Sequence, residues 1–410
     1  MDSMGTCYGK SITSETIMYK IRTYNSISPK GLVRFSEDRY KVSADCDQPE
    51  GIILRSQKLH DADIPASLLA VARAGAGINN LPVDRYTAQG IVVFNTPGAN
   101  ANAVKELVVG ALMMASRNIY GGMNYVQELT HIEDSIELSK LLEKEKKRFA
   151  GAEIRGKTLG VVGLGAIGSM IANLALDLGM EVIGHDPAIS VEAAWQLSRN
   201  VERIDSLDLL LARADFLTLH VPAIPETHQL IDASVLSRIK PTTKILNFAR
   251  EEVICLDAIL EALDNGNLAG YVTDFPDPKL LGRDNVLLMP HLGASTLEAD
   301  ENCAVMAVSQ LMDFLENGNI VNSVNFPPTK LARRAGNRIT FSNQNVPKVL
   351  GNVLAILADD GLNVIDMVNK SRSDIAYNIV DVEGDLDPSL SSKIGLVSGV
   401  KGVKLFSPME

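Results

Sequence analysis

Short apolar runs alternate with stretches whose apolar positions recur every three or four residues through most of the 410-residue chain. The short runs are typical of buried strands, and the periodic stretches are typical of helices. Before residue 118, the runs GIILRS, LAVARAG and IVVFN alternate with helical pieces such as 83–89, which predicts small strand-helix-strand units. Residues 101–117 predict a long, largely buried helix, followed by Gly121, Gly122 and a charged stretch.

From Lys157 the alternation becomes regular, with predicted strands in TLGVVGLG, EVIGHD, DFLTLHV, TKILNFA, LAGYVTD and VLLM and helices between them. This order predicts an α/β fold with an open, doubly wound parallel sheet of the Rossmann type. Ser295 and Glu298 predict a capping box that opens a long helix ending near Gly318. The last 75 residues or so read as βαββαβ, which predicts a small ferredoxin-like unit.

Composition limits the class of protein. The chain is 46% hydrophobic and 22% charged, and it has no 18-residue apolar run, so we expect a protein that stays in water and does not cross a membrane. The first 18 residues lack the pattern of a targeting signal, which favours a loose tail and a cytoplasmic location. Four scattered cysteines predict neither disulfides nor a metal site. A net charge of -11 disfavours nucleic acid as a partner.

A glycine-rich segment, residues 163–168 with the sequence GLGAIG, follows one predicted strand and opens a helix. Without a side chain, Gly163 can make the tight turn, Gly165 lets a pyrophosphate approach the backbone, and Gly168 lets helix and strand pack closely. Together with Ala166 and Ile167, these residues predict a dinucleotide site at a helix N-terminus. A glycine-rich turn without a ligand is the alternative.

Asp186 ends the next predicted strand, 18 residues after Gly168. A carboxylate there can accept hydrogen bonds from the adenosine ribose hydroxyls and would repel a 2'-phosphate, so the pattern favours NAD over NADP. The alternative is an aspartate that only precedes Pro187 in a turn.

Two reactive side chains follow later strands at the sheet edge where ligands of such folds bind. Arg250 follows TKILNFA, and its guanidinium can clamp a carboxylate at two points. His291 follows VLLMP, and its imidazole can take the proton of a hydroxyl during hydride transfer. We expect Asp274 or Asp277 to orient this ring. A surface salt-bridge arginine and a core histidine are the alternatives.

Several motifs, in their order and spacing, resemble the D-2-hydroxyacid dehydrogenase family from Tyr19 to the end of the chain. They are LRS, RAGAGINN, NTPGANANAVKELVVG, GKTLGVVGLGAIG, LHVPAIPETHQLI, NFAR and PHLGAST. The resemblance implies a flexible tail at 1–18, a flavodoxin-like substrate-binding domain at 19–106 with about 300–326, an NAD-binding Rossmann domain at 107–299, and a C-terminal ACT domain at 336–410.

The resemblance also implies roles for individual residues. Arg250 would bind the substrate carboxylate and carbonyl oxygen, and His291 would exchange the proton. Substrate contacts are implied for Arg55, Ser56, Ala76, Gly77 and Asn100. Beyond the glycine turn and Asp186, NAD contacts are implied for His220, Val221, Pro222, Thr227, Phe248, Ala249, Asp274 and Gly293.

The chain departs from the family at the glutamate that partners the histidine. Where the family has a longer loop ending in Glu-Pro, this sequence has TDFPDPKL, so Asp277 is the nearest equivalent. The usual Gly-Gly after the arginine is replaced by Glu251 and Glu252, which we expect to face solvent.

A phosphate-bearing substrate needs more cationic groups than Arg55 and Arg250 provide. The candidates lie in one basic segment, which the family architecture suggests reaches in from a neighbouring subunit: Lys144, Lys146, Lys147 and Arg148. A solvated helix face is the alternative.

The last unit resembles an ACT domain, and Asn343, Asn345 and Asn363 occupy the polar positions at which serine-regulated relatives hold their effector. Lys348 replaces the glycine of those relatives, so L-serine binding competes with a second interpretation, a dimerisation module without effector.

The resemblance implies NAD-dependent oxidation of 3-phospho-D-glycerate to 3-phosphohydroxypyruvate, the first step of L-serine biosynthesis, by a homodimer or homotetramer. Another D-2-hydroxyacid, such as glycerate or lactate, is an alternative substrate. A non-enzymatic, NAD-sensing corepressor-like protein is an alternative from another class.

Overall fold

The computed structural model describes residues 18–334 and 336–408, which form two compact units. Unit 2 is Gly98–Ala299, and unit 1 combines Met1–Pro97 with Asp300–Glu410. The tail expected at 1–18 lies, except for Met18, outside the described residues.

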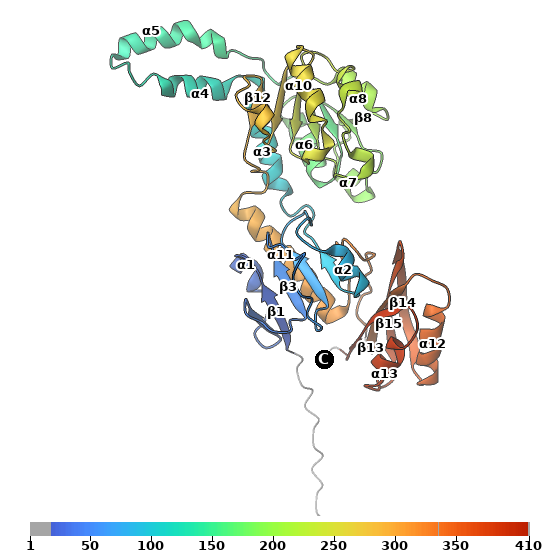
Figure 1. The fold of residues 1–410 in the computed structure, drawn as a ribbon. Coiled ribbons are helices and arrows are strands. Elements are labelled where there is room, and N and C mark those ends of the chain that lie inside the picture. The colour runs from blue at the N-terminus through green and yellow to red at the C-terminus, as the bar shows by residue number, and fades with distance from the viewer. Residues whose placement is uncertain (1–17, 335, 409–410) are drawn as a thin grey trace, which may run out of the picture. The chain divides into compact units, whose positions relative to one another are not determined.

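Unit 2 is built on a seven-stranded sheet of order β12-β11-β10-β9-β6-β7-β8, in which all pairs are parallel (Figure 1). The strands are β6 (Thr158–Val162), β7 (Glu181–His185), β8 (Glu202–Arg203), β9 (Phe216–Leu219), β10 (Lys244–Asn247), β11 (Gly270–Thr273) and β12 (Val286–Leu288). The chain order reverses between β6 and β9, which confirms the predicted doubly wound sheet.

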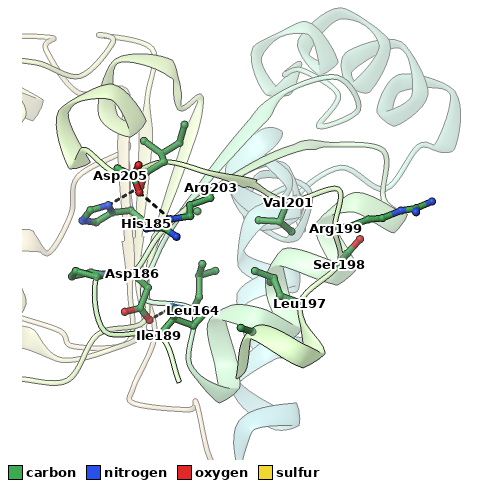
Figure 2. Close-up of a pocket in the computed structure, with 14 residues that line it drawn as sticks. Leu164, His185, Asp186, Ile189, Leu197, Ser198, Arg199, Val201, Arg203 and Asp205 are labelled. Carbon is green, nitrogen blue, oxygen red and sulfur yellow. Dashed lines mark hydrogen bonds and ion pairs between the residues drawn. The ribbon is translucent and has the colours of Figure 1, made fainter. Parts of the chain in front are cut away.

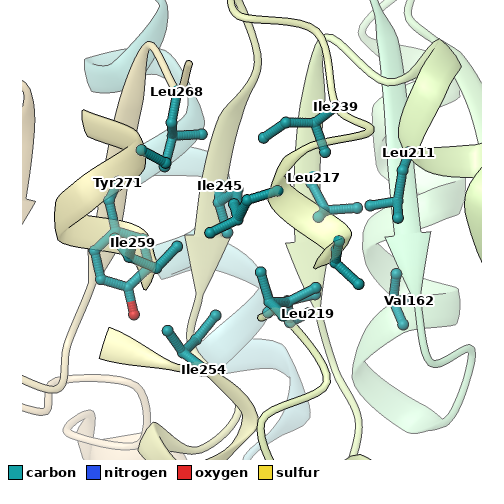
Figure 3. Close-up of a cluster of buried hydrophobic side chains, with 14 of the residues drawn as sticks. Val162, Leu211, Leu217, Leu219, Ile239, Ile245, Ile254, Ile259, Leu268 and Tyr271 are labelled. Atoms are coloured by element: carbon teal, nitrogen blue, oxygen red, sulfur yellow. The ribbon is translucent and has the colours of Figure 1, made fainter. Parts of the chain in front are cut away.

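Helices cover both faces of this sheet, which explains why its strands, except the exposed edge strand β8, read as largely apolar runs. One buried cluster joins the strands to α8 (Leu207–Arg213), α9 (Ala233–Leu236) and α10 (Leu256–Asp264), and Figure 3 shows its side chains around Ile245. A second cluster joins them to α3 (Ala101–Ser116) and α6 (Ala166–Asp177). The short α7 (Val191–Gln196) follows β7.

Two further helices of unit 2, α4 (Ile119–Glu128) and α5 (Ser135–Glu145), have no buried residue. They form a hairpin that extends from the body of the unit (Figure 1), and the 3-10 helix η1 (Lys146–Phe149) follows them. Their exposed large apolar side chains are Tyr120, Met123, Val126 and Ile136.

The first part of unit 1 is a five-stranded parallel sheet of order β2-β1-β3-β4-β5. Its strands are β1 (Tyr19–Thr23), β2 (Tyr40–Ser43), β3 (Gly51–Leu54), β4 (Ala70–Arg73) and β5 (Val92–Phe94), with helices α1 (Pro29–Leu32) and α2 (Val83–Ala88). This order is that of flavodoxin-like sheets, so the flavodoxin-like fold predicted for this part is confirmed.

The C-terminal part of unit 1 is a four-stranded antiparallel sheet of order β14-β15-β13-β16, which confirms the βαββαβ prediction. Its elements are β13 (Asn337–Gln344), α12 (Val349–Asp359), β14 (Asn363–Arg372), β15 (Ile375–Glu383), α13 (Leu390–Gly395) and β16 (Val400–Phe406). Phe341, Val353 and Ile394 belong to the buried cluster between its sheet and helices.

The long helix α11 (Leu297–Asn317) precedes the C-terminal sheet in the chain and contacts the first sheet of unit 1, because the Tyr19 hydroxyl of β1 donates to its Leu315 carbonyl. The Oγ1 of Thr296 accepts the backbone N–H of Ala299 at 3.1 Å, so the cap is Thr296 and the expected box at Ser295 was one residue early. The side chain of Arg338 is fully buried; it pairs with Asp381 at 2.6 Å and donates to the Asn317 carbonyl at 3.0 Å. The C-terminal sheet therefore binds the end of α11.

Within 18–334 and 336–408, none of the helices combines the length and the apolar character that a bilayer crossing requires.

Candidate active site

The glycine turn between β6 and α6 has the geometry that a dinucleotide site needs. Gly163 has a φ of 88°, and a Cβ there would lie 2.7 Å from the His220 backbone. A Cβ on Gly168 would lie 1.9 Å from the Gly163 carbonyl oxygen, so close packing requires glycine at both positions. Gly165 has no heavy atom within 4 Å of an added Cβ, so open space lies where a pyrophosphate would approach. Exposed Ala166 and half-buried Ile167 begin α6.

Asp186, directly after β7, ties this turn to the neighbouring strand. One carboxylate oxygen accepts the backbone N–H of Leu164 at 2.8 Å, and the other accepts that of Ala188 at 2.9 Å. The side chain is half-buried, so its remaining lone pairs can accept ribose hydroxyls.

A pocket of about 470 Å³ opens beside Asp186 (Figure 2). Its lining comes from the turn before α6, the end of β7, the residues after α7, and β8. Sequence reasoning missed most of this lining: His185, Leu197, Ser198, Arg199, Val201 and Arg203. Of these residues, only His185 could have been found from the sequence, because it precedes Asp186. The others come from a segment without a recognisable motif.

The segment after β9 begins with His220, whose Nε2 lies 2.8 Å from the Thr218 hydroxyl. Its Nδ1 is buried without a partner among the described residues. Burial lowers the pKa of His220 to about 3, so the ring is neutral. Thr227 Oγ1 accepts the Ile224 N–H at 3.0 Å and donates to the Pro222 carbonyl at 2.5 Å, while half-buried Val221 packs close to Gly163.

Arg250 follows β10 and two buried residues, Phe248 and Ala249. The Asn247 amide fixes this turn, because it accepts the Ala249 N–H at 3.2 Å and donates to the Arg250 carbonyl at 2.9 Å. Arg250 is half-buried, and its Nη1 donates to the Ala249 carbonyl at 2.6 Å.

The carboxyl ends of β11 and β12 bring Asp274, His291 and Gly293 together. Asp274 is 2% exposed, and its Oδ2 accepts the Gly293 N–H at 3.0 Å. The His291 N–H donates to the Asp274 carbonyl at 2.9 Å. The His291 ring is exposed, its φ is 47°, and it meets the Phe275 ring edge-on at 5.1 Å between centroids.

Asp274 is also electrostatically coupled to the two reactive groups. Burial raises the pKa of its carboxyl, while the Gly293 N–H, His291 and Arg250 oppose that rise. Its Oδ1 is buried without a hydrogen-bond partner among the described residues. A buried acceptor without a partner fits an absent donor, such as the carboxamide of a nicotinamide ring.

Asp277 has a different environment from the one expected. Its side chain accepts the Lys279 N–H at 2.8 Å and caps the 3-10 helix η4 (Pro278–Leu280). In the described part of the chain, no hydrogen bond or ion pair joins Asp277 to His291.

The substrate residues expected in unit 1 lie after β3 and β4. Arg55 and Ser56 follow β3, and the Arg55 Nη1 lies 2.7 Å from the Asp300 Oδ2. The Ala76 carbonyl accepts the Asn95 amide at 2.7 Å, and the Gly77 carbonyl accepts Arg73. Asn100, in unit 2, is the residue before α3, and its side chain makes no capping hydrogen bond.

The basic segment, which runs from the last turn of α5 into η1, is exposed and partly paired with glutamates of the same segment. Lys146 pairs with Glu143 at 2.5 Å, and Arg148 pairs with Glu145 at 3.1 Å and lies 5.3 Å from the Tyr125 ring centre. Lys147 and Lys144 are exposed.

The three asparagines of the C-terminal unit differ in exposure. Asn343 is buried, and its Oδ1 accepts the Asn378 amide at 2.8 Å. Asn345 is exposed and its amide donates to the Ser373 carbonyl at 3.2 Å, while Asn363 is exposed at the start of β14. Lys348, before α12, has a φ of 76°, a conformation that favours glycine.

Comparison with known proteins places this geometry in a family. The model for the D-isomer specific 2-hydroxyacid dehydrogenase NAD-binding domain matches residues 109–293. The D-3-phosphoglycerate dehydrogenase of Haemophilus influenzae is 31% identical over 384 residues, which are 88% of this chain and 89% of that protein. The chain therefore belongs to the D-isomer specific 2-hydroxyacid dehydrogenases, and the predicted family and NAD as cofactor are confirmed.

Two further comparisons define how far the likeness extends. The D-3-phosphoglycerate dehydrogenase of Synechocystis sp. is 39% identical over 287 residues, covering 68% of this chain, and this chain spans about half of that relative's length, 49%. The NAD+-bound 3-phosphoglycerate dehydrogenase structure from Entamoeba histolytica shares the fold, with a TM-score of 0.58 and 24% identity over 75% of this chain and 99% of that one.

Proposed function

We propose that the protein oxidises 3-phospho-D-glycerate to 3-phosphohydroxypyruvate with NAD, the first step of L-serine biosynthesis. The observation that carries the proposal is the convergence of His291, Arg250 and Asp274 at the carboxyl ends of β10, β11 and β12. The names of the curated relatives support this substrate.

The cofactor residues fit a dinucleotide along one edge of the unit 2 sheet. The turn of Gly163, Gly165, Ala166, Ile167 and Gly168 holds the pyrophosphate at the α6 N-terminus, and Asp186 holds the adenosine ribose beside the pocket. The remaining contacts are assigned to His220, Val221, Pro222, Thr227, Phe248, Ala249, Asp274 and Gly293. NAD, when bound, supplies the hydride acceptor.

The chain's own groups handle the proton and the developing charge. His291 takes the proton of the substrate's C2 hydroxyl, because an imidazole is both basic and exposed here. Arg250 binds the carboxylate and stabilises the oxygen that becomes the carbonyl. Arg55, Ser56, Ala76, Gly77 and Asn100 are assigned to substrate binding.

The carboxylate that partners His291 has two candidates. The family pattern assigns Asp277, whose side chain caps η4 in the described structure. Asp274 is the carboxylate whose charge is coupled to His291. Turnover and pH profile of Asp277→Asn decide: a changed profile keeps Asp277 in the mechanism, and an unchanged one removes it.

The phosphate is assigned to Arg55 of one chain together with Lys147 and Arg148 of a neighbouring copy, in a homodimer or homotetramer. The support is the α4–α5 hairpin: neither helix has a buried residue within one chain, and α4 exposes Tyr120, Met123 and Val126. Neutralising Lys147 and Arg148 should weaken affinity for 3-phosphoglycerate and leave NAD affinity intact. If these residues only form a solvated helix face, affinity for 3-phosphoglycerate should not change.

The C-terminal unit is assigned L-serine as its effector, at Asn343, Asn345 and Asn363. Against this, Lys348 stands where serine-regulated relatives have glycine, and its φ of 76° is a conformation that favours glycine. Isothermal titration with L-serine tests the assignment, and neither heat nor inhibition would leave a dimerisation module.

A panel of substrates separates the alternatives for the reaction. NADH formation is measured with 3-phosphoglycerate, D-glycerate and D-lactate, each with NAD and NADP. A lower KM for the phosphorylated acid supports the proposal. A lower KM for glycerate or lactate favours those substrates, and no turnover of any acid favours the corepressor-like alternative.

A further inference from the structure

Arg55, the proposed phosphate ligand, already holds a carboxylate. Its Nη1 lies 2.7 Å from Oδ2 of Asp300, a residue of the first turn of α11, and the two side chains are 42% and 39% exposed. Only one of the five guanidinium donors takes part in this contact. The pair is therefore accessible, and it is held at a single point.

The backbone beneath Arg55 is fixed. Oδ1 of Asn25 accepts the N–H groups of residues 55, 56 and 57 at 3.4, 3.0 and 2.9 Å. The Arg55 carbonyl accepts Nε of Arg73 at 3.0 Å and the amide of Asn80 at 3.2 Å. The Arg55 side chain can therefore exchange partners without a change in the backbone that carries it.

Within the intact pair, the carboxylate of Asp300 offsets the charge of the Arg55 guanidinium. An exposed ion pair contributes only about 0 to 1 kcal/mol, because solvent screens it and both side chains lose freedom. A dianionic phosphate forms stronger charge-assisted hydrogen bonds than a single carboxylate contact. The phosphate can therefore replace Asp300 at the guanidinium.

We propose that Asp300 is a specificity-determining residue that competes with the substrate's phosphate for Arg55. In the free enzyme its carboxylate occupies the guanidinium, and substrate binding exchanges one anion for the other. Asp300 thereby weakens binding of any phosphate-bearing ligand at Arg55, and it has no effect on acids that carry no anion at this end. The inference rests on the proposed function, which assigns the phosphate to Arg55.

The test compares Asp300→Asn with the native chain in steady-state kinetics. Relief from competition should lower the KM for 3-phosphoglycerate on the order of fivefold, the equivalent of about 1 kcal/mol, with kcat changed less than about twofold. The KM for D-glycerate should not change. A matched control is Glu301→Gln on the same turn of α11, which breaks an exposed pair with Lys30 at 2.6 Å and should leave both KM values unchanged.

A double-mutant cycle tests whether Asp300 acts through Arg55. In an Arg55→Gln background, Asp300→Asn should have no further effect. A KM that rises in Asp300→Asn, or an effect that persists without Arg55, overturns the inference, because Asp300 then orients the substrate or acts elsewhere.

Binding of inorganic phosphate separates this inference from the proposed reaction. Titration of the full chain by calorimetry should show severalfold tighter phosphate binding in Asp300→Asn and loss of it in Arg55→Gln, whether or not 3-phosphoglycerate is oxidised. Equal phosphate affinity in the native chain and in Asp300→Asn would contradict the proposed competition for Arg55. If phosphate binding changes as expected but 3-phosphoglycerate is not oxidised, only the proposed reaction is contradicted.

Discussion

The backbone N–H of His291 donates a hydrogen bond to the Asp274 carbonyl oxygen at 2.9 Å. This bond fixes the end of β12 against the end of β11, and the Asp274 side chain holds Gly293 on the other side of the histidine. His291 keeps a φ of 47°, which a non-glycine residue adopts only when its surroundings hold it there. The backbone thus places the imidazole, while its ring stays exposed to a ligand.

Replacing His291 by Gln should abolish most of the turnover. General base catalysis contributes about 10²- to 10⁴-fold, so kcat should fall by that order. NADH affinity, measured by fluorescence titration, should stay within about twofold of the native value, because the cofactor contacts assigned to unit 2 remain. A kcat close to the native one would remove His291 from the mechanism.

Alanine at Gly165 and alanine at Gly168, two of the three glycines of the turn before α6, should affect different properties. A Cβ at Gly165 meets no atom, so Gly165→Ala should fold normally and lose about tenfold in NAD affinity, or ~1.4 kcal/mol, since the methyl group keeps the pyrophosphate from the backbone.

Gly168→Ala is the matched comparison, because its Cβ would overlap the Gly163 carbonyl. It should destabilise unit 2 by at least about 2 kcal/mol, seen as a lower Tm. Equal Tm losses in the two variants would contradict the roles assigned to these glycines.

Lys404 should make the stability of unit 1 depend on pH. Its Nζ donates to the Leu315 carbonyl and lies 4.7 Å from the Tyr19 ring centre, and burial lowers its pKa to about 7, against the opposing charges of Glu50 and Glu316. In an unfolded chain a lysine has a pKa of about 10.4. Between these values the unfolded state binds a proton that the folded state does not, so the free energy of unfolding rises with pH.

Lys404→Met removes this dependence. The Tm of the native chain, relative to that of Lys404→Met, should increase as pH rises from about 7 to 9 and should be flat below about 7. Lys370→Met, at an exposed position of β14, serves as the control and should leave the native slope intact. If the Tm of the native chain and that of Lys404→Met change with pH in the same way, the pKa of Lys404 is not lowered in the folded state.

Six of the seven strands of unit 2 could be predicted because they are largely buried and their sequences are mainly apolar. The seventh, β8, was missed because it consists of two exposed charged residues. The strands β1 and β2 were not singled out, since YKIRT and YKVS mix charged and apolar residues at a sheet edge or next to it. Only contacts with residues distant in sequence, such as the Tyr19 hydroxyl on the Leu315 carbonyl at 2.8 Å, define their place.

The candidate site also has residues that could be predicted from the sequence and residues that could not. The glycine turn and Asp186 follow β6 and β7 directly, and Arg250 and His291 come shortly after the ends of β10 and β12, so their place at the carboxyl edge of the sheet could be predicted from the strand pattern. Asp300 could not be found, because it lies 245 residues from its partner Arg55. The capping role of the Asp277 side chain depends on the conformation of η4, which the sequence pattern does not specify.

Reduction of NAD by the purified full chain with 3-phospho-D-glycerate, followed by NADH absorbance, tests the central claim most directly. The account predicts steady turnover that needs NAD, falls sharply with NADP, and is lost in His291→Gln while that variant still binds NADH. Turnover that persists in His291→Gln, or NADH binding without oxidation of any 2-hydroxy acid, would contradict it.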